Sequence, residues 1–178
     1  KLNGNVRSAY LFNPRLNSTD FIQYICEDFG LNGQKKSKGE YITQLHHFLM
    51  ACYANNENVV LIIDEAQNLS IPVLEQIRML SNLETEKEKM LQIILLGQLE
   101  LLEKLQSPEL KQLNQRIAIR HRLLPLTRAE MEGYIYQRLL VAGAQGNVTF
   151  SNSALNETYQ FSKGIPRLIN LLCDRALL

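Results

Sequence analysis

The sequence predicts an α/β fold, in which a parallel sheet with flanking helices is followed by a small helical lid. The run VVLII at residues 59–63 has no polar alternation, which is typical of a strand buried on both faces of a parallel sheet. Residues 92–96 form a second run of this type. After Pro125 only helical patterns remain. We therefore expect an α/β core over residues 1–125 and a lid over residues 126–178.

The first part of the core has a strand and two helices. Residues 6–12 mix β-branched, aromatic and apolar side chains and predict a short strand. Ser18 is the expected cap of the next helix, and Gly30 stands where a left-handed C-terminal cap is expected. After a polar loop at residues 32–39, apolar residues at helical spacing predict a second helix over residues 40–54.

The second part of the core alternates helices with strands. Pro72 suits the first turn of a helix that follows the 59–63 strand. Two short helices are expected at residues 99–105 and 108–116, and a last strand at residues 119–123.

The lid begins at a helix-start signal. Thr127 and Glu130 form a capping box, which predicts a helix from this point. A second helix is expected at residues 153–161, and a third from Pro166 onward.

Composition excludes several classes of protein. The 178 residues are 46% hydrophobic and 21% charged, with Lys+Arg 19 against Asp+Glu 18, which fits neither a disordered tail nor a polycation that coats nucleic acid. The 3 cysteines lack metal-ligand spacing and are expected to be reduced core thiols. No apolar run approaches the roughly 20 residues of a membrane helix, and no signal-peptide pattern opens the chain.

Two acidic residues carry the strongest chemical signal. Asp64 and Glu65 directly follow the 59–63 strand, at the sheet edge where open α/β folds bind ligands. An aspartate there can hold Mg²⁺, while the adjacent glutamate points elsewhere and can orient an attacking water, as nucleotide hydrolysis requires. The alternative is structural, because strands often end in acidic residues that begin a turn.

Gln98 and Arg167 are further candidates. Gln98 follows the second buried strand and could place water near a terminal phosphate, or it could simply cap the next helix. Arg167 follows Gly164-Ile165-Pro166 at a helix start, where it can grip a phosphate. The alternative for Arg167 is a surface cation, which the positive end of a helix disfavours unless an anion is near.

Arg116 belongs to a basic series with Arg120, His121 and Arg122. Residues 120 and 122 share one face of the expected strand, where a solvated face is the default interpretation. Arg116, at the end of its helix, could instead reach a nucleotide held by a neighbouring subunit.

Together these segments resemble the AAA+ ATPases of the general secretion pathway protein A (ExeA) family, with relatives in mannose-sensitive haemagglutinin pilus biogenesis. The resemblance covers nearly the whole chain. The matching stretches are LFNPRL (11–16), VVLIIDEAQNLS (59–70), LEQIRMLSNLET (74–85), LQIILLGQLEL (91–101), QRI (115–117) and GIPRLINLLCDRALL (164–178).

The resemblance implies a P-loop NTPase fold that uses ATP and Mg²⁺. It makes Asp64 and Glu65 the Walker B pair, with Asp64 as the magnesium ligand, Gln98 the sensor-1 residue, Arg116 an arginine finger and Arg167 sensor 2. It further implies a homo-oligomer or ring and partners such as general secretion pathway protein B. The expected location is the cytoplasmic side of the inner membrane of a Gram-negative bacterium, reached through regions outside these residues.

One departure from the family is large. The family's first strand and phosphate-binding loop are absent before Val6, so we expect the chain to be a fragment, truncated at both ends, of a parent ATPase and to be inactive alone. In the family, that strand lies between the strands expected at residues 92–96 and 119–123. Two alternatives remain: a DNA-associated AAA+ protein of the transposition-regulator type, which the near-neutral charge disfavours, and a non-hydrolysing interaction module.

Overall fold

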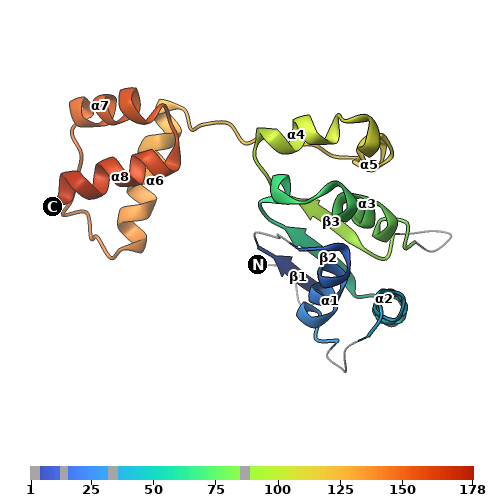
Figure 1. The fold of residues 1–178 in the computed structure, drawn as a ribbon. Coiled ribbons are helices and arrows are strands. Elements are labelled where there is room, and N and C mark those ends of the chain that lie inside the picture. Colours follow the sequence, from blue (N-terminus) through green and yellow to red (C-terminus); the bar gives the residue numbers. More distant parts are fainter. Residues whose placement is uncertain (1–4, 13–15, 32–35, 85–88) are drawn as a thin grey trace. The chain divides into compact units, whose positions relative to one another are not determined.

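The computed structural model describes all residues except 1–4, 13–15, 32–35 and 85–88. The chain forms two compact units, Lys1–Ile119 and Arg120–Leu178, each of which has its own core (Figure 1). We call them unit 1 and unit 2.

The sheet of unit 1 has three parallel strands in the order β1-β2-β3. They are β1 (Val6–Leu11), β2 (Asn58–Ile63) and β3 (Gln92–Leu95). Leu11 pairs with Ile63, and Ile63 with Leu95, so the three strands end level with one another. The predicted α/β class with a parallel sheet is confirmed, and the level ends bring the segments after β2 and β3 together.

Three helices cover one face of this sheet: α1 (Ser18–Asp28), α2 (Lys38–Ala54) and α3 (Ile71–Leu80). Asn17, and not Ser18, caps α1, because its side chain accepts from the backbone N of Thr19 and of Asp20. Gly30 has a φ of +78°, as its expected left-handed position requires. The main core residues are fully buried, among them Phe21, Ile22, Ile25, Leu45, Leu49, Leu61, Ile63, Leu74 and Ile77.

After the short 3-10 turn η1 (Ala66–Asn68), α3 and β3, unit 1 continues with α4 (Leu99–Leu105). The expected helix at residues 108–116 is divided into a 3-10 turn, η2 (Pro108–Leu110), and α5 (Lys111–Arg116). Leu110 and Leu113 from these elements are buried in the core, where η2 and α5 pack against α3.

The opposite face of the sheet is partly exposed. Tyr10 of β1 and Ile94 of β3 are each 45% exposed, and Leu96 is 43% exposed. The expectation that residues 92–96 form a fully buried strand is therefore wrong for this face. The alternation of β1 and β3 places one set of side chains against the helices of unit 1, and no described helix of unit 1 covers the other set.

The prediction of a strand at residues 119–123 is also wrong. These residues have no regular secondary structure and pair with no described strand. Ile119 and Leu123 are each 87% exposed. A strand needs a hydrogen-bonding neighbour, and an alternating sequence alone does not supply one.

Unit 2 consists of α6 (Arg128–Val141), α7 (Asn152–Ser162) and α8 (Pro166–Leu177). The predicted capping box is confirmed, because Thr127 accepts from the backbone N of Glu130 while the Glu130 carboxylate accepts from the backbone N of Thr127. Met131, Ile135, Leu155 and Ile169 form the core.

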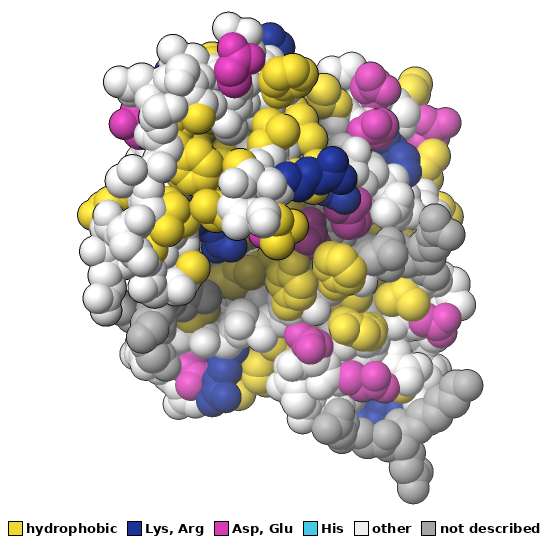
Figure 2. Space-filling model, turned by 90° about the vertical axis from the view of Figure 1, so that its left-hand side faces the viewer, with side chains coloured by type: hydrophobic (Ala, Val, Ile, Leu, Met, Phe, Trp, Pro, Cys, Tyr) yellow, Lys and Arg dark blue, Asp and Glu magenta, His cyan; other side chains and the backbone are white. Residues whose placement is uncertain are grey.

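Hydrophobic side chains are also frequent on the surface drawn in Figure 2. Within the described ranges, no helix is both long and apolar enough to cross a bilayer.

Candidate active site

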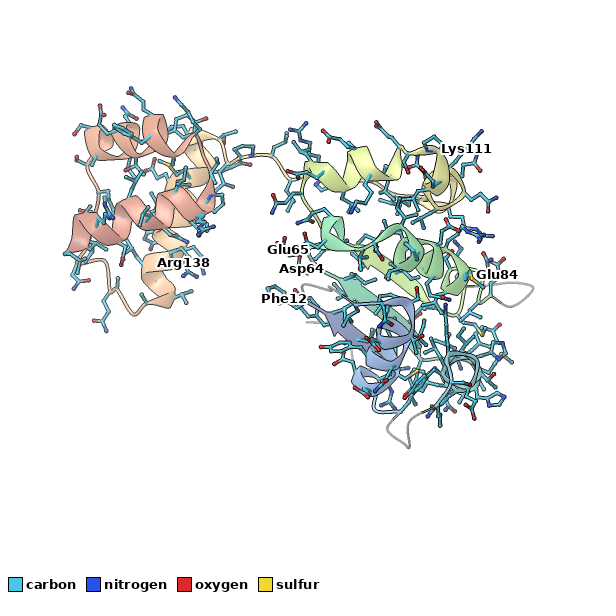
Figure 3. All side chains as sticks on the ribbon, viewed as in Figure 1. Phe12, Asp64, Glu65, Glu84, Lys111 and Arg138 are labelled. Atoms are coloured by element: carbon cyan, nitrogen blue, oxygen red, sulfur yellow. The ribbon has the colours of Figure 1, made fainter. Side chains whose placement is uncertain are left out.

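The carboxyl ends of the three strands form the candidate site. Asp64 and Glu65 follow β2, next to Phe12 at the end of β1 (Figure 3). The backbone N of Asp64 donates to the Leu11 carbonyl at 2.9 Å. On the other side, the backbone N of Ala66 donates to the Leu96 carbonyl at 2.8 Å. The turn that carries both carboxylates is therefore tied to both neighbouring strands.

The half-buried Asp64 carboxylate accepts two hydrogen bonds. Its Oδ1 accepts from the backbone N of Glu65, and its Oδ2 accepts from the Tyr10 hydroxyl, each at 2.8 Å. The bond to Asp64 is the main cause of a raised Tyr10 pKa, with burial second. Because a carboxylate has about four lone-pair positions, two accepted bonds leave room for a further ligand.

A magnesium ion fits this donor set. Mg²⁺ is typically held by one or two carboxylates, with waters and substrate phosphates completing the shell. Asp64 and Glu65 supply hard oxygen ligands of this kind at a partly exposed strand end. Among the described residues, no group of three or more His, Cys, Asp or Glu could form a dedicated all-protein metal cage.

Glu65 points toward a different partner from Asp64. Its backbone adopts the left-handed region with φ 52° and ψ 36°, which is uncommon for a residue other than glycine. Its Oε2 accepts from Nε2 of Gln67 at 2.6 Å. Adjacent carboxylates with separate partners match the sequence expectation that the two point differently.

Gln98 lies at the N-cap position of α4, and its side chain makes no capping hydrogen bond. Instead, its backbone N donates to Oε1 of Gln67 at 3.2 Å. The capping role considered for this side chain is therefore not what the structure shows. Asp64, Glu65 and Gln98 are brought together at one edge of the sheet.

The two arginines lie elsewhere in the chain. Arg116 is the last residue of α5 in unit 1, is exposed, and forms no hydrogen bond or ion pair with the described residues. Arg167 is exposed on the first turn of α8 in unit 2. Their roles as arginine finger and sensor 2 remain predictions.

Sequence reasoning missed three residues of this site. Tyr10 contacts Asp64, Gln67 contacts Glu65, and Lys104 of α4 donates to the Leu69 carbonyl at 2.9 Å. The sequence held a signal that Tyr10 is not a core residue, because strand alternation places it on the face opposite the buried Leu11. None existed for Lys104, whose contact depends on how α4 packs on the η1 turn.

The chain is similar to proteins of a known family. Residues 3–105, more than half of the chain, match a family described as "AAA domain". The chain belongs to this AAA domain family. The chain is 44% identical over 171 residues to "General secretion pathway protein A" of Aeromonas hydrophila, a match that covers 96% of this chain and 31% of that protein. It therefore spans about a third of the length of this relative.

Solved structures confirm the α/β fold of the chain. The ORC2 protein of Aeropyrum pernix in its ADP form matches with a TM-score of 0.68 at 16% identity, over 97% of this chain and 48% of that chain. CDC6P from Pyrobaculum aerophilum matches with a TM-score of 0.58 at 17% identity, over 77% of this chain and 36% of that one. At such identities the likeness concerns the fold alone.

Proposed function

We propose that this AAA domain is part of an ATPase in which Asp64 and Glu65 are the Walker B pair. The observation that carries the proposal is the pair of carboxylates at the end of β2, each held by a different hydrogen-bond partner. Asp64 would hold Mg²⁺, which supplies charge neutralisation at the phosphates. Glu65 would accept hydrogen bonds from the attacking water and orient it, and Gln98 would lie beside both.

We propose that most phosphate contacts are supplied by a part of the parent protein outside these residues. The 178 residues contain no G-x-x-x-x-G-K-[ST] sequence, whose backbone amides and lysine hold the phosphates in P-loop enzymes. We therefore propose that the 178 residues alone neither bind ATP tightly nor hydrolyse it. In the assembled protein, Arg116 would reach a nucleotide on a neighbouring subunit, and Arg167 would grip a phosphate from the lid.

The similarity to this relative supports a proposal for the cellular role. The 44% identity to a general secretion pathway protein supports an ATPase that drives assembly of a type II secretion or pilus machine. Its partners would be secretion or pilus-assembly proteins, such as general secretion pathway protein B, at the cytoplasmic face of the inner membrane. The number of basic residues nearly equals that of acidic residues, which gives no support to a nucleic-acid partner.

The proposal is tested on the purified full-length parent. It should hydrolyse ATP when Mg²⁺ is present and stop when the metal is chelated. A titration with a fluorescent ATP analogue should saturate for the parent at micromolar concentrations, on the order of −8 kcal/mol of binding free energy, and fail to saturate for the 178-residue chain. A parent that neither binds nor hydrolyses ATP would overturn the proposal in favour of an interaction module.

A further inference from the structure

The side chain of Gln67 bridges the ends of two strands. Its Nε2 donates to Oε2 of Glu65 at 2.6 Å, and its Oε1 accepts from the backbone N of Gln98 at 3.2 Å. A glutamine amide has one donor end and one acceptor end, so these two contacts together set the direction in which it points. The Glu65 carboxylate is thereby tied to the segment that follows β3.

Gly97 leaves the space that this bridge occupies. A Cβ at position 97 would lie 2.8 Å from Oε1 of Gln67 and 2.9 Å from Cδ2 of Leu101. Both distances are shorter than the usual closest approach of a side-chain carbon to another heavy atom. A larger residue at 97 would therefore displace the Gln67 amide or the α4 side chain behind it.

The backbone around Gln67 is tied to the same segment. Lys104 of α4 donates from Nζ to the carbonyl of Gln67 at 2.5 Å and to that of Leu69 at 2.9 Å. The backbone N of Ala66 donates to the Leu96 carbonyl at 2.8 Å. The η1 turn, which carries Gln67 and directly follows Glu65, thus shares its hydrogen bonds with the end of β3 and with α4.

We propose that Gln67 is a positioning residue for hydrolysis, whose amide holds the Glu65 carboxylate in the direction needed to orient water and couples that direction to the β3–α4 segment. The inference rests on the proposed function of Glu65. A misplacement of about 1 Å in a reacting group can reduce a rate by roughly a hundredfold, so a tether of this kind has a large effect on turnover. It has little effect on nucleotide affinity, because Gln67 itself need not touch the nucleotide.

The test uses the full-length parent with four single variants and one double variant. Gln67→Ala removes the bridge, and Gln67→Glu keeps the size of the side chain but replaces the donor facing Glu65 with an oxygen. Gly97→Ala pushes on Oε1 of Gln67. Gly133→Ala, in α6, is the matched control, because a Cβ there would meet nothing within 4 Å. The measurements are kcat at saturating Mg·ATP, the Kd of a fluorescent ATP analogue, and the thermal midpoint.

Both Gln67 variants should lower kcat about 10- to 100-fold while Kd changes less than about twofold and the thermal midpoint is nearly unchanged. Gly97→Ala should lower kcat similarly, and the double variant with Gln67→Ala should lose no more than either single variant, because both act on one amide. Gly133→Ala should match the wild type in kcat and in Kd.

Three results would overturn the positioning role while leaving the proposed function intact: an unchanged kcat in both Gln67 variants, a raised kcat, or losses in Kd and thermal midpoint as large as the loss in kcat. A raised kcat would mean that Gln67 restrains Glu65 instead of aiming it. An inactive wild-type parent would remove the proposed function and this inference with it.

Discussion

Asp64 and Glu65 are adjacent in the chain, yet their carboxylates have different partners. Asp64 accepts from Tyr10 of β1, and Glu65 accepts from Gln67 beyond its own left-handed turn. The sequence predicted the acidic pair and its place at the strand end. It did not predict the partners, because hydrogen bonds across strands depend on register and on the turn geometry after β2.

Cys26 gives a prediction at the residue scale. Burial raises the pKa of its thiol to about 11, against an ordinary value of 9.0, and the thiol contacts the Tyr41 carbonyl at 3.6 Å. Because only the thiolate is nucleophilic, the reactive fraction at mildly alkaline pH is about a hundredfold below that of a free thiol. Alkylation of Cys26 should therefore be slow in the folded chain and become fast on unfolding.

Mass spectrometry after iodoacetamide treatment measures this labelling. Cys173 is the internal comparison, because it is only half-buried and should react earlier than Cys26. Equal, rapid labelling of both thiols in the folded chain would contradict the burial of Cys26.

At the scale of elements, helix positions followed from local signals. The capping box at Thr127 and Glu130 and the span of α4 were predictable, because both depend on neighbours in the sequence. The cap of α1 was misplaced by one residue, since Asn17 and Ser18 are both good capping types and only geometry decides between them. The prediction of a strand at residues 119–123 was wrong, because hydrogen-bonded pairing depends on a neighbouring strand and not on the segment alone.

Gly164 gives a prediction at the element scale. Its φ is +78°, and a Cβ there would lie 1.9 Å from the Leu126 carbonyl oxygen, which is backbone and cannot swing away. Gly164→Ala should therefore lower the free energy of unfolding of unit 2 by at least about 2 kcal/mol, through left-handed strain and the loss of the Leu126 N–H bond to the Gly164 carbonyl.

Gly133→Ala is the control, and it should change the free energy of unfolding in the opposite direction. Gly133 lies inside α6 with open space around its Cβ position, so alanine should stabilise the helix by about 0.5–1 kcal/mol. Denaturant unfolding followed by circular dichroism measures both variants. A Gly164→Ala chain as stable as the wild type would show that the approach of Leu126 is not tight in solution.

At the scale of the whole molecule, some features of the fold were predictable from the sequence and others were not. Unit 1 carries Asp64, Glu65 and Gln98 in the segments that follow β2 and β3, and unit 2 is a small helical unit with its own core. The α/β class, the order of elements and the acidic pair were predictable, because hydrophobic periodicity and the residues at strand ends depend only on neighbouring positions in the sequence. The half-exposed face of β1 and β3 was not predictable. An apolar strand sequence indicates burial but does not show which element covers each face of the strand.

The central claim is that the two carboxylates divide the work of hydrolysis, and Glu65→Gln in the full-length parent tests it most directly. Turnover and nucleotide affinity are measured for the wild type, for Glu65→Gln, and for Glu103→Gln on the exposed side of α4 as a control. Glu65→Gln should retain ATP binding and lose at least about a hundredfold in turnover, because water is no longer activated while Asp64 remains. Undiminished hydrolysis by Glu65→Gln would contradict the assignment.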